Sequence, residues 1–387
     1  MAFTISGRGI PTGGILDGAI TSAKINSSGL AANSIASDAV STAKIADDAV
    51  TEAKWGGNQL SHRNLIINGD MKIAQRGTSG TNTDDSQFPS IDRWLTRTYN
   101  GTGRVTLAQQ SINSNGFKNS VRVTPSTTDT SGTYGYNLGQ YIEGYNTDHL
   151  NWGTSSAQTI TLSFWVKSSE TGTFSVSFRN GAGDRSWVSS YSISTADTFE
   201  YKTITVTGPT DGTWATDTNA SILVEFCYGG QTSKSTSSLD QWVNGNYTAA
   251  TGQTDIMQST SNYFEITGVQ LEMGSVATPF EHRSYGEELA RCERYYQDTG
   301  LFRYKIAARW NTNSGNPLCE YRMSTPMRSA PSVSVGTSFE TGDSYIGDPT
   351  ISGATFKAFY MVGSGTYSTN TIGYFHNGSL KLDSELS

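Results

Sequence analysis

The first sixty residues carry a large apolar residue at every fifth position, and this period constrains the fold more than any other feature of the chain. The series is Ile10, Ile15, Ile20, Ile25, Leu30, Ile35, Val40, Ile45, Val50, Trp55 and Leu60. A period of five fits neither an α-helix, at 3.6 residues per turn, nor a strand, at two. Each ten-residue unit must therefore bend, and the intervening Gly, Asn, Ser and Asp residues favour such turns.

Two apolar anchors in ten residues cannot close a core within one chain. A repeat that cannot bury its own face must stack on neighbours. We therefore predict that residues 16–62 form an intertwined stalk of identical chains, preceded by an attachment segment at 1–15. Its predicted core consists of Ile20, Ile25, Leu30, Ile35, Val40, Ile45, Val50 and Trp55. The alternative is a disordered arm rich in Ala and Ser, which would need no periodic isoleucine.

From about residue 63 the apolar period changes to two, which is typical of half-buried strands. Residues 160–166, 174–178 and 222–228 show this alternation most clearly, and Gly-, Asn- and Ser-rich loops separate them. The phase of the alternation changes between Tyr201 and Ile204, which suggests a β-bulge. Many short strands with turns between them predict a mainly β chain, with an antiparallel β-sandwich or jelly roll over residues 63–283.

A single helix is predicted after the sandwich, over residues 284–300. Ser284 and Glu287 have the spacing of a capping box. Apolar residues then recur on one helical face, at Tyr285, Leu289, Cys292 and Tyr296. Alternation returns after residue 301, which predicts a small β tip domain over 301–387.

Several segments resemble tail-fibre proteins of tailed bacteriophages. The matching segments start a domain similar to carbohydrate-binding modules, mark two of its strands, and form its closing strand and helix. They are Asn64–Asp70, Ala74–Gly77, Ile91–Trp94, Gly139–Glu143, Leu162–Lys167, Thr251–Gln253, Ile266–Glu272, Ala277–Glu281 and Arg283–Leu289. The ten-residue repeat is also similar to the shafts of such fibres.

This resemblance implies a homotrimer in the virion tail, assembled in the host cytoplasm. Tail adaptor or nozzle proteins would bind its N-terminus. A host-surface glycan or outer-membrane receptor would bind toward its C-terminus, so that the protein mediates adsorption. Fold does not fix function. A polysaccharide depolymerase of the tail and a purely structural tail spacer therefore stay open as alternatives.

Glycan binding would use exposed aromatic faces with nearby hydrogen-bonding groups. The long loop Gly229–Thr260 has no strand pattern and is a functional candidate. The candidates in or next to sandwich loops are Trp187, Trp214, Trp242 and Tyr247, and those in the tip are Tyr345, Phe359, Tyr360, Tyr367 and Tyr374. The alternative for any single tryptophan is a place in the core.

No cofactor is expected, with one exception. Asn68, Asp70 and Glu272 flank the first and last strands of the predicted sandwich, where hard oxygen ligands would suit a structural Ca²⁺. The alternative for these three side chains is hydrogen bonding between adjacent strands.

Enzyme motifs are lacking, so we expect no catalysis. The sequence has no zinc-binding histidine pair, nucleophile elbow, phosphate-binding loop or dinucleotide fingerprint. A depolymerase would need two carboxylates about 5–10 Å apart. Asp92, Glu143, Asp184 and Glu272 are available, but no spacing pairs them.

Charge and cysteine content exclude other classes of function. The net charge is −7 and the pI about 5.2, without the basic stripe of a nucleic-acid binder. No apolar run reaches the length of a membrane span. The widely spaced Cys227, Cys292 and Cys319 form no disulfide or metal pattern, and the first two are expected to be small buried hydrophobes. We expect folding in a reducing cytoplasm, without a secretion signal.

Overall fold

The computed structural model describes residues 62–386, apart from 84, 133, 231–233, 302–305, 311–316, 340, 343–344, 347–348, 356, 363–372 and 376–377. The predicted attachment segment and stalk, with its core positions from Ile20 to Trp55, lie outside the described residues. Among the described residues, no helix has both the length and the apolar character needed to cross a lipid bilayer.

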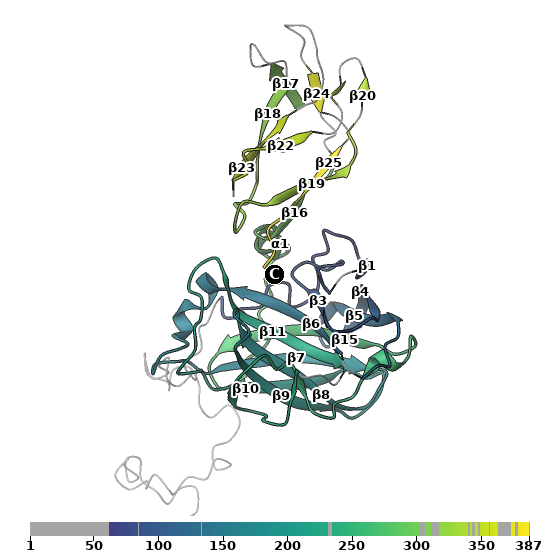
Figure 1. Cartoon of the computed structure of the whole chain (residues 1–387), viewed down its shortest axis with the longest axis vertical. Coiled ribbons are helices and arrows are strands. Elements are labelled where there is room, and N and C mark those ends of the chain that lie inside the picture. The colour runs from purple at the N-terminus through teal and green to yellow at the C-terminus, as the bar shows by residue number, and fades with distance from the viewer. Residues whose placement is uncertain are drawn as a thin grey trace, which may run out of the picture. The chain divides into compact units, whose positions relative to one another are not determined.

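Two antiparallel sheets pack face to face and form a β-sandwich (Figure 1). The six-stranded sheet has the order β1 (Ser79–Thr81), β4 (Arg104–Ser114), β5 (Phe117–Thr127), β15 (Phe264–Met273), β7 (Ile160–Ser168), β10 (Glu200–Val206). The seven-stranded sheet has the order β13 (Trp242–Asn244), β9 (Arg185–Ile193), β8 (Gly172–Asn180), β11 (Ala220–Gly229), β6 (Gly135–Glu143), β3 (Leu95–Tyr99), β2 (Ser86–Gln87). The mainly β class and the antiparallel sandwich of jelly-roll kind predicted from the sequence are confirmed.

The alternating apolar residues fill the space between the two sheets. In β7, Ile160, Leu162, Phe164 and Val166 are fully buried in one core with the apolar residues of β8 and β11. The Phe164 and Phe226 rings meet edge to face at 4.9 Å between centroids, which joins the two sheets. Alternation with period two places such residues on one face of a strand, which is why the sequence pattern located these strands.

The bulge suggested near Tyr201 is absent, because β10 pairs with β7 without a register shift from Glu200 opposite Val166 to Val206 opposite Ile160. Tyr201 instead lies on the outer face of the sheet. Its ring packs 5.2 Å from that of Trp165, the one aromatic residue of β7 outside the alternation. An outward aromatic pair across two strands produced the apparent change of phase.

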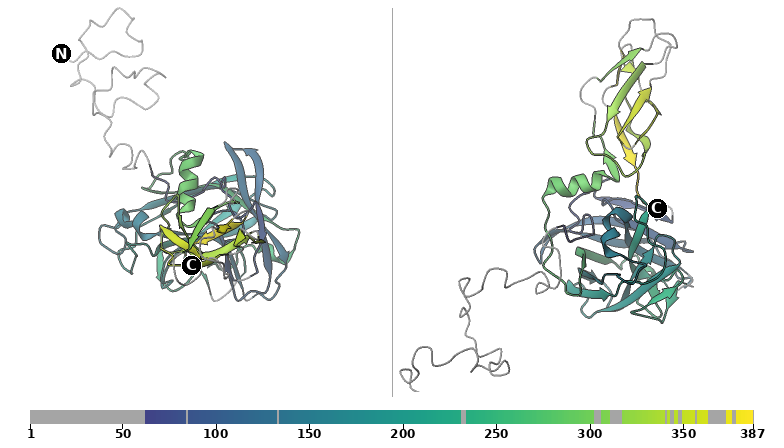
Figure 2. Two further views of the ribbon diagram at one scale, coloured as in Figure 1. Left: turned by 90° about the horizontal axis from the view of Figure 1, so that it is seen from above. Right: turned by 90° about the vertical axis from the view of Figure 1, so that its left-hand side faces the viewer.

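The helix is shorter than the sequence suggested. α1 spans Tyr285–Glu293, and the Ser284 hydroxyl caps it by accepting from the Glu287 amide. Cys292 is buried and Leu289 half-buried as expected, but Tyr285 is exposed. Tyr296 lies in the next strand and not on the helix. Figure 2 shows α1 as a green coiled ribbon followed by the yellow-green strands of the C-terminal part.

The C-terminal strands form two further sheets around a separate small core. The three-stranded sheet has the order β16 (Tyr296–Asp298), β25 (Ser379–Asp383), β19 (Ser332–Thr337). The seven-stranded one has the order β20 (Thr341–Gly342), β21 (Tyr345–Ile346), β24 (Gly373–Phe375), β17 (Ile306–Trp310), β18 (Pro317–Arg322), β23 (Ala358–Val362), β22 (Thr350–Ser352). The core consists of Met327, Phe339, Met361, Phe375, Leu380 and Leu382.

After the C-terminal sheets, the last residues of the chain contact the sandwich again. β25 pairs antiparallel with β16, so the strand that leaves the α1 region and the strand that comes back are neighbours. Leu386 then packs in an apolar cluster with Leu95 and Leu223 from the outer face of the seven-stranded sandwich sheet. Glu385 forms ion pairs with Arg93 and Arg76. These last residues, expected to belong to the tip, therefore contact the sandwich.

Two cysteines are inaccessible thiols. Cys227 and Cys292 are free and fully buried, as expected. Burial raises the pKa of Cys227 to about 12 and that of Cys292 well above its ordinary value. Because thiolate is the reactive form, we expect no labelling by a disulfide reagent in folded Cys319→Ser protein at about pH 8. Both thiols should react in denaturant. Rapid labelling of either one before unfolding would contradict this burial.

Candidate functional site

The outer face of the seven-stranded sandwich sheet is covered at both ends and open between them. At one end it packs on the apolar cluster that contains Cys292 and Leu386. At the other end, the segment 234–255 crosses it and includes the short parallel strands β12 (Ser235–Thr236) and β14 (Ala249–Ala250). The Ala250 amide donates to Ser175 Oγ at 3.1 Å, and Thr254 N donates to Thr173 O at 2.7 Å.

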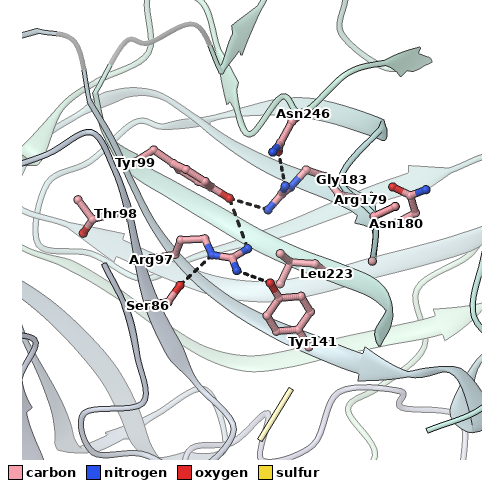
Figure 3. A pocket seen from close by; sticks show the side chains of 12 residues that line it. Ser86, Arg97, Thr98, Tyr99, Tyr141, Arg179, Asn180, Gly183, Leu223 and Asn246 are labelled. Carbon is pink, nitrogen blue, oxygen red and sulfur yellow. Dashed lines mark hydrogen bonds between the residues drawn. The ribbon is translucent and has the colours of Figure 1, made fainter. Parts of the chain in front are cut away.

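A pocket of about 370 Å³ lies on this face (Figure 3). Strands β3, β6, β8 and β11, the turn after β8 and the crossing segment all contribute to it. Its lining residues are Ser86, Arg97, Thr98, Tyr99, Tyr141, Arg179, Asn180, Gly181, Ala182, Gly183, Leu223 and Asn246. Pockets of roughly 300–1,000 Å³ hold small ligands, so this one has room for about one sugar residue.

Arg97 is held in the pocket wall by neutral hydroxyl groups. Its Nε donates to Ser86 Oγ at 3.0 Å, and its terminal nitrogens donate to the phenol oxygens of Tyr99 and Tyr141. Among the described residues, the carboxylate that pairs with Arg97 is that of Glu225, whose Oε1 lies 3.8 Å from Arg97 Nη1. This separation gives an ion pair without a hydrogen bond.

Arg179 makes the close ion pair of the site. Its Nε donates to Glu225 Oε2 at 3.1 Å, Nη2 donates to Tyr99 Oη at 2.8 Å, and Nη1 donates to Asn246 Oδ1. The Tyr99 hydroxyl thus lies between two guanidinium groups, as Figure 3 shows. Gly139 faces Glu225 across the sheet, where a Cβ atom would lie 2.8 Å from Glu225 Cγ. A glycine is therefore needed for the carboxylate to lie flat on the sheet.

The surroundings in the pocket keep the Tyr99 hydroxyl neutral and the two arginines charged. Burial, with the charge of Glu225, raises the pKa of Tyr99 to about 12. For Arg97 and Arg179 burial lowers the pKa, but the attraction of Glu225 together with the tyrosine oxygens and the side-chain hydrogen bonds outweighs it and leaves the pKa of both above the ordinary value. Lys234, 5.5 Å from the Tyr99 ring centre, has a lowered pKa because of burial and the charge of Arg179.

Polar groups without a protein partner lie on the same sheet face. Both amide atoms of Asn137, the hydroxyl of Ser177 and Oε1 of Glu225 are buried and accept or donate no hydrogen bond among the described residues. Ser177 lies directly opposite Glu225 in the β8–β11 ladder. Because buried polar groups nearly always have partners, this face has hydrogen-bonding capacity beyond what its own side chains use.

The predicted loop tryptophans form a cluster of their own. Trp152, Trp187 and Trp214 all contact Trp242, and Trp152 also contacts Trp214, with edge-to-face ring centroids 4.7–5.7 Å apart. All four indole N–H groups donate within the protein, for example Trp242 to Thr207 O at 2.6 Å. Trp187 is only 6% exposed. A smaller cavity of about 150 Å³ lies against Trp152 and Trp214.

Among the described residues, Tyr247 makes no ring contact with this cluster. The Tyr247 ring packs on the backbone at Gly245, and its amide donates to Ser186 Oγ at 3.3 Å. Tyr345 lies in β21 and Tyr360 in β23, but their side chains are outside the described part of the chain, as is all of Tyr367.

The three Ca²⁺ candidates have protein partners. Asn68 Nδ2 donates to the Ile73 and Asp92 carbonyl oxygens, and Asp70 pairs with Lys72 at 2.9 Å. Glu272 accepts from the Thr278 amide and hydroxyl at 2.8 and 2.7 Å. Among the described residues, no group of three or more His, Cys, Asp or Glu side chains is arranged to hold a metal. The Ca²⁺ site therefore stays a prediction.

Sequence reasoning did not find the residues of the sheet-face pocket. A signal existed, because Arg97, Arg179 and Glu225 are charged residues inside strands of a chain with only 16% charged residues. Charged residues are almost never buried in a sheet unless they are paired, so charges in central strands indicate a paired cluster. The sequence does not show that the strands of these three residues, β3, β8 and β11, lie in one sheet, and this information was needed to predict the pocket.

No protein-family model and no curated protein sequence matches the chain. Weak likenesses exist to solved structures. The enzymatically active domain of bacteriophage CBA120 tailspike protein 4 is 16% identical with a TM-score of 0.30, over 54% of this chain and 21% of that one. A family 11 carbohydrate-binding module of a Clostridium thermocellum cellulase is 16% identical with a TM-score of 0.26, over 53% of this chain and 98% of that one.

A family 30 carbohydrate-binding module is 12% identical with a TM-score of 0.28, over 60% of this chain and 97% of that one. Because every one of these TM-scores is below 0.5, the fold assignment rests on the sheets described above and not on these likenesses.

Proposed function

We propose that this protein is a glycan-binding subunit of a phage tail fibre, which attaches the particle to a host-surface glycan. The observation that carries the proposal is the pocket on the outer sheet face, with the aromatic side chains of Tyr99 and Tyr141 beside the donors of Arg97, Arg179 and Asn246. Sugar rings pack on aromatic faces, and their hydroxyl groups exchange hydrogen bonds with amide and guanidinium groups.

Binding without catalysis is the favoured mode of action. The carboxylates available to a depolymerase are engaged elsewhere: Asp92 accepts from Gln75, Glu143 from Arg294 and Tyr295, and Asp184 from Asn180. A glycosidase needs one carboxylic acid that is free to donate and a second group beside the substrate. With the contacts of Glu272 to Thr278, all four sequence candidates are engaged by other groups of the protein.

The five-residue repeat supports assembly into a homotrimer through residues 16–62, with tail adaptor or nozzle proteins bound at the N-terminus. Three weak sites on one fibre, and several fibres on one particle, raise the overall affinity through effective concentration. Weak binding at each pocket is therefore compatible with firm adsorption. Light scattering of the whole chain tests this step, and a mass near 41.7 kDa would contradict the trimer.

Asn246→Ala is expected to weaken glycan binding about three- to tenfold, the worth of one net hydrogen bond. Asn246 lines the pocket and accepts from Arg179. The matched control is Asn244→Ala, two residues away, where the side chain is exposed and accepts from Arg185 outside the pocket. Binding is measured by glycan array and by competition with phage adsorption. Equal losses in both variants would place the glycan elsewhere.

The two alternatives have distinct outcomes in the same experiments. A depolymerase would release reducing ends from host polysaccharide. A structural spacer would bind no glycan, and its soluble form would leave phage adsorption unchanged.

A further inference from the structure

The pocket on the sheet face is a site of positive charge in an acidic protein. Among the described residues, Arg97 and Arg179 line it and Lys234 lies against the Tyr99 ring, whereas the carboxylate that contacts the two arginines is Glu225. Asp85 precedes the lining residue Ser86 in the chain and Asp184 follows Gly183, but neither aspartate lines the pocket. Asp184 accepts a hydrogen bond from Asn180. The chain as a whole carries −7, so this local surplus of cations runs against the net charge.

The two arginines differ in how well their charge is neutralised. Arg179 is 2% exposed and has the close contact with Glu225. Within the described part of the chain, Arg97 has only the 3.8 Å contact with the same carboxylate, and its hydrogen-bond acceptors are three neutral hydroxyl groups. Its side chain is 17% exposed. A largely buried cation normally has a close anionic partner, but the hydrogen bonds that the Glu225 carboxylate accepts among the described residues come from Arg179.

We propose that the pocket takes an anionic sugar residue, whose acidic group pairs with the guanidinium of Arg97. This inference rests on the proposed function and specifies its ligand class. A carboxylate matches the planar fork of a guanidinium group, and such charge-assisted pairs are about twice as strong as neutral hydrogen bonds. The tyrosine hydroxyls and Asn246 are then left for the sugar's own hydroxyl groups.

The shared chemistry of the ligand is a sugar with a negative charge, and a uronic or sialic acid carboxylate and a sugar phosphate both satisfy it. The experiment is a glycan array probed with the whole chain, followed by calorimetry on matched pairs. Each acidic glycan is compared with its carboxyl-reduced counterpart, and phosphorylated glycans form a separate arm. We expect the acidic member to bind about tenfold more tightly than its reduced form. Added NaCl should reduce this difference in affinity, because salt screens the charge pair.

Arg97→Gln should remove this preference, so that the variant binds an acidic glycan and its reduced counterpart with equal affinity. Arg97→Lys keeps the charge and should retain part of the preference. Arg322→Gln, at an exposed ion pair with Glu320 in the C-terminal sheet, is the matched control and should behave as wild type. Thermal melts of all variants separate loss of binding from loss of folding.

The outcomes distinguish the two proposals. Equal affinity for acidic and reduced glycans, or neutral glycans alone on the array, overturns the charged ligand but leaves glycan binding intact. An array without any binding overturns both. If Arg97→Gln melts early, the charge preference of Arg97→Lys and the salt dependence of the wild-type protein decide the question.

Discussion

Glu225→Ala is expected to lower the free energy of unfolding by about 3–5 kcal/mol, because it leaves two buried or half-buried arginines without their carboxylate. Glu225 is 0% exposed and contacts both Arg179 and Arg97. Chemical denaturation followed by intrinsic tryptophan fluorescence measures the effect. A loss smaller than about 1 kcal/mol would mean that Tyr99 and Asn246 alone satisfy these cations.

Two further variants isolate the cause. Glu170→Ala, at an exposed position between β7 and β8, should change stability by no more than about 0.5 kcal/mol. The double variant Glu225→Ala with Arg179→Met removes both partners of the close pair. Because an apolar replacement of a buried ion pair is often neutral, the double variant should recover part of the loss. A double variant less stable than Glu225→Ala would contradict the ion-pair explanation.

Glu385→Ala is expected to have an effect of the same order, about 3–5 kcal/mol. Burial raises the pKa of Glu385, and the charges of Arg93 and Arg76 oppose that shift. Arg93 is only 1% exposed. Its guanidinium group lies 3.5 Å from the centre of the Tyr295 ring and donates a hydrogen bond to Tyr141 O at 2.6 Å. Without Glu385 this cation stays buried and unpaired. Limited proteolysis and hydrogen exchange should also show release of the residues around Leu386.

Asp383→Ala is the matched control in the same part of the chain. Asp383 pairs with Arg76 at 3.1 Å, but its side chain is 43% exposed. Because solvent screens such a pair, we expect a loss of at most about 1 kcal/mol. If both variants lost the same stability, the burial of Glu385 would not be the reason for its effect.

The β-sandwich could be predicted from the sequence because each of its strands buries one face. Residues such as Leu162 and Val176 alternate with polar neighbours, and that alternation survives in any arrangement of the strands. The helix start was also readable, since the Ser284 cap is a local interaction. Its end was not, because β16 is fixed by pairing with β25, which lies about eighty residues further along the chain.

The pocket could not be predicted for the same reason. Arg97, Arg179 and Glu225 come from β3, β8 and β11, and their proximity depends on the order of strands in the sheet. Alternation says which face a residue occupies but not which strand lies beside it. The loop tryptophans show the opposite case. Trp187 and Trp242 were candidates for sugar binding because of their place in or next to loops, whereas Trp242 packs against Trp187 and is itself contacted by Trp152 and Trp214.

The ladder between β16 and β25 has an evolutionary consequence. It brings Asp298 opposite Lys381, so everything between them is a closed loop whose ends are fixed by the ladder itself. Doubling or halving such a loop changes its closure free energy by only about 0.6 kcal/mol. Segments outside β19, which itself pairs with β25, can therefore change in length by recombination or design at little cost in loop-closure free energy.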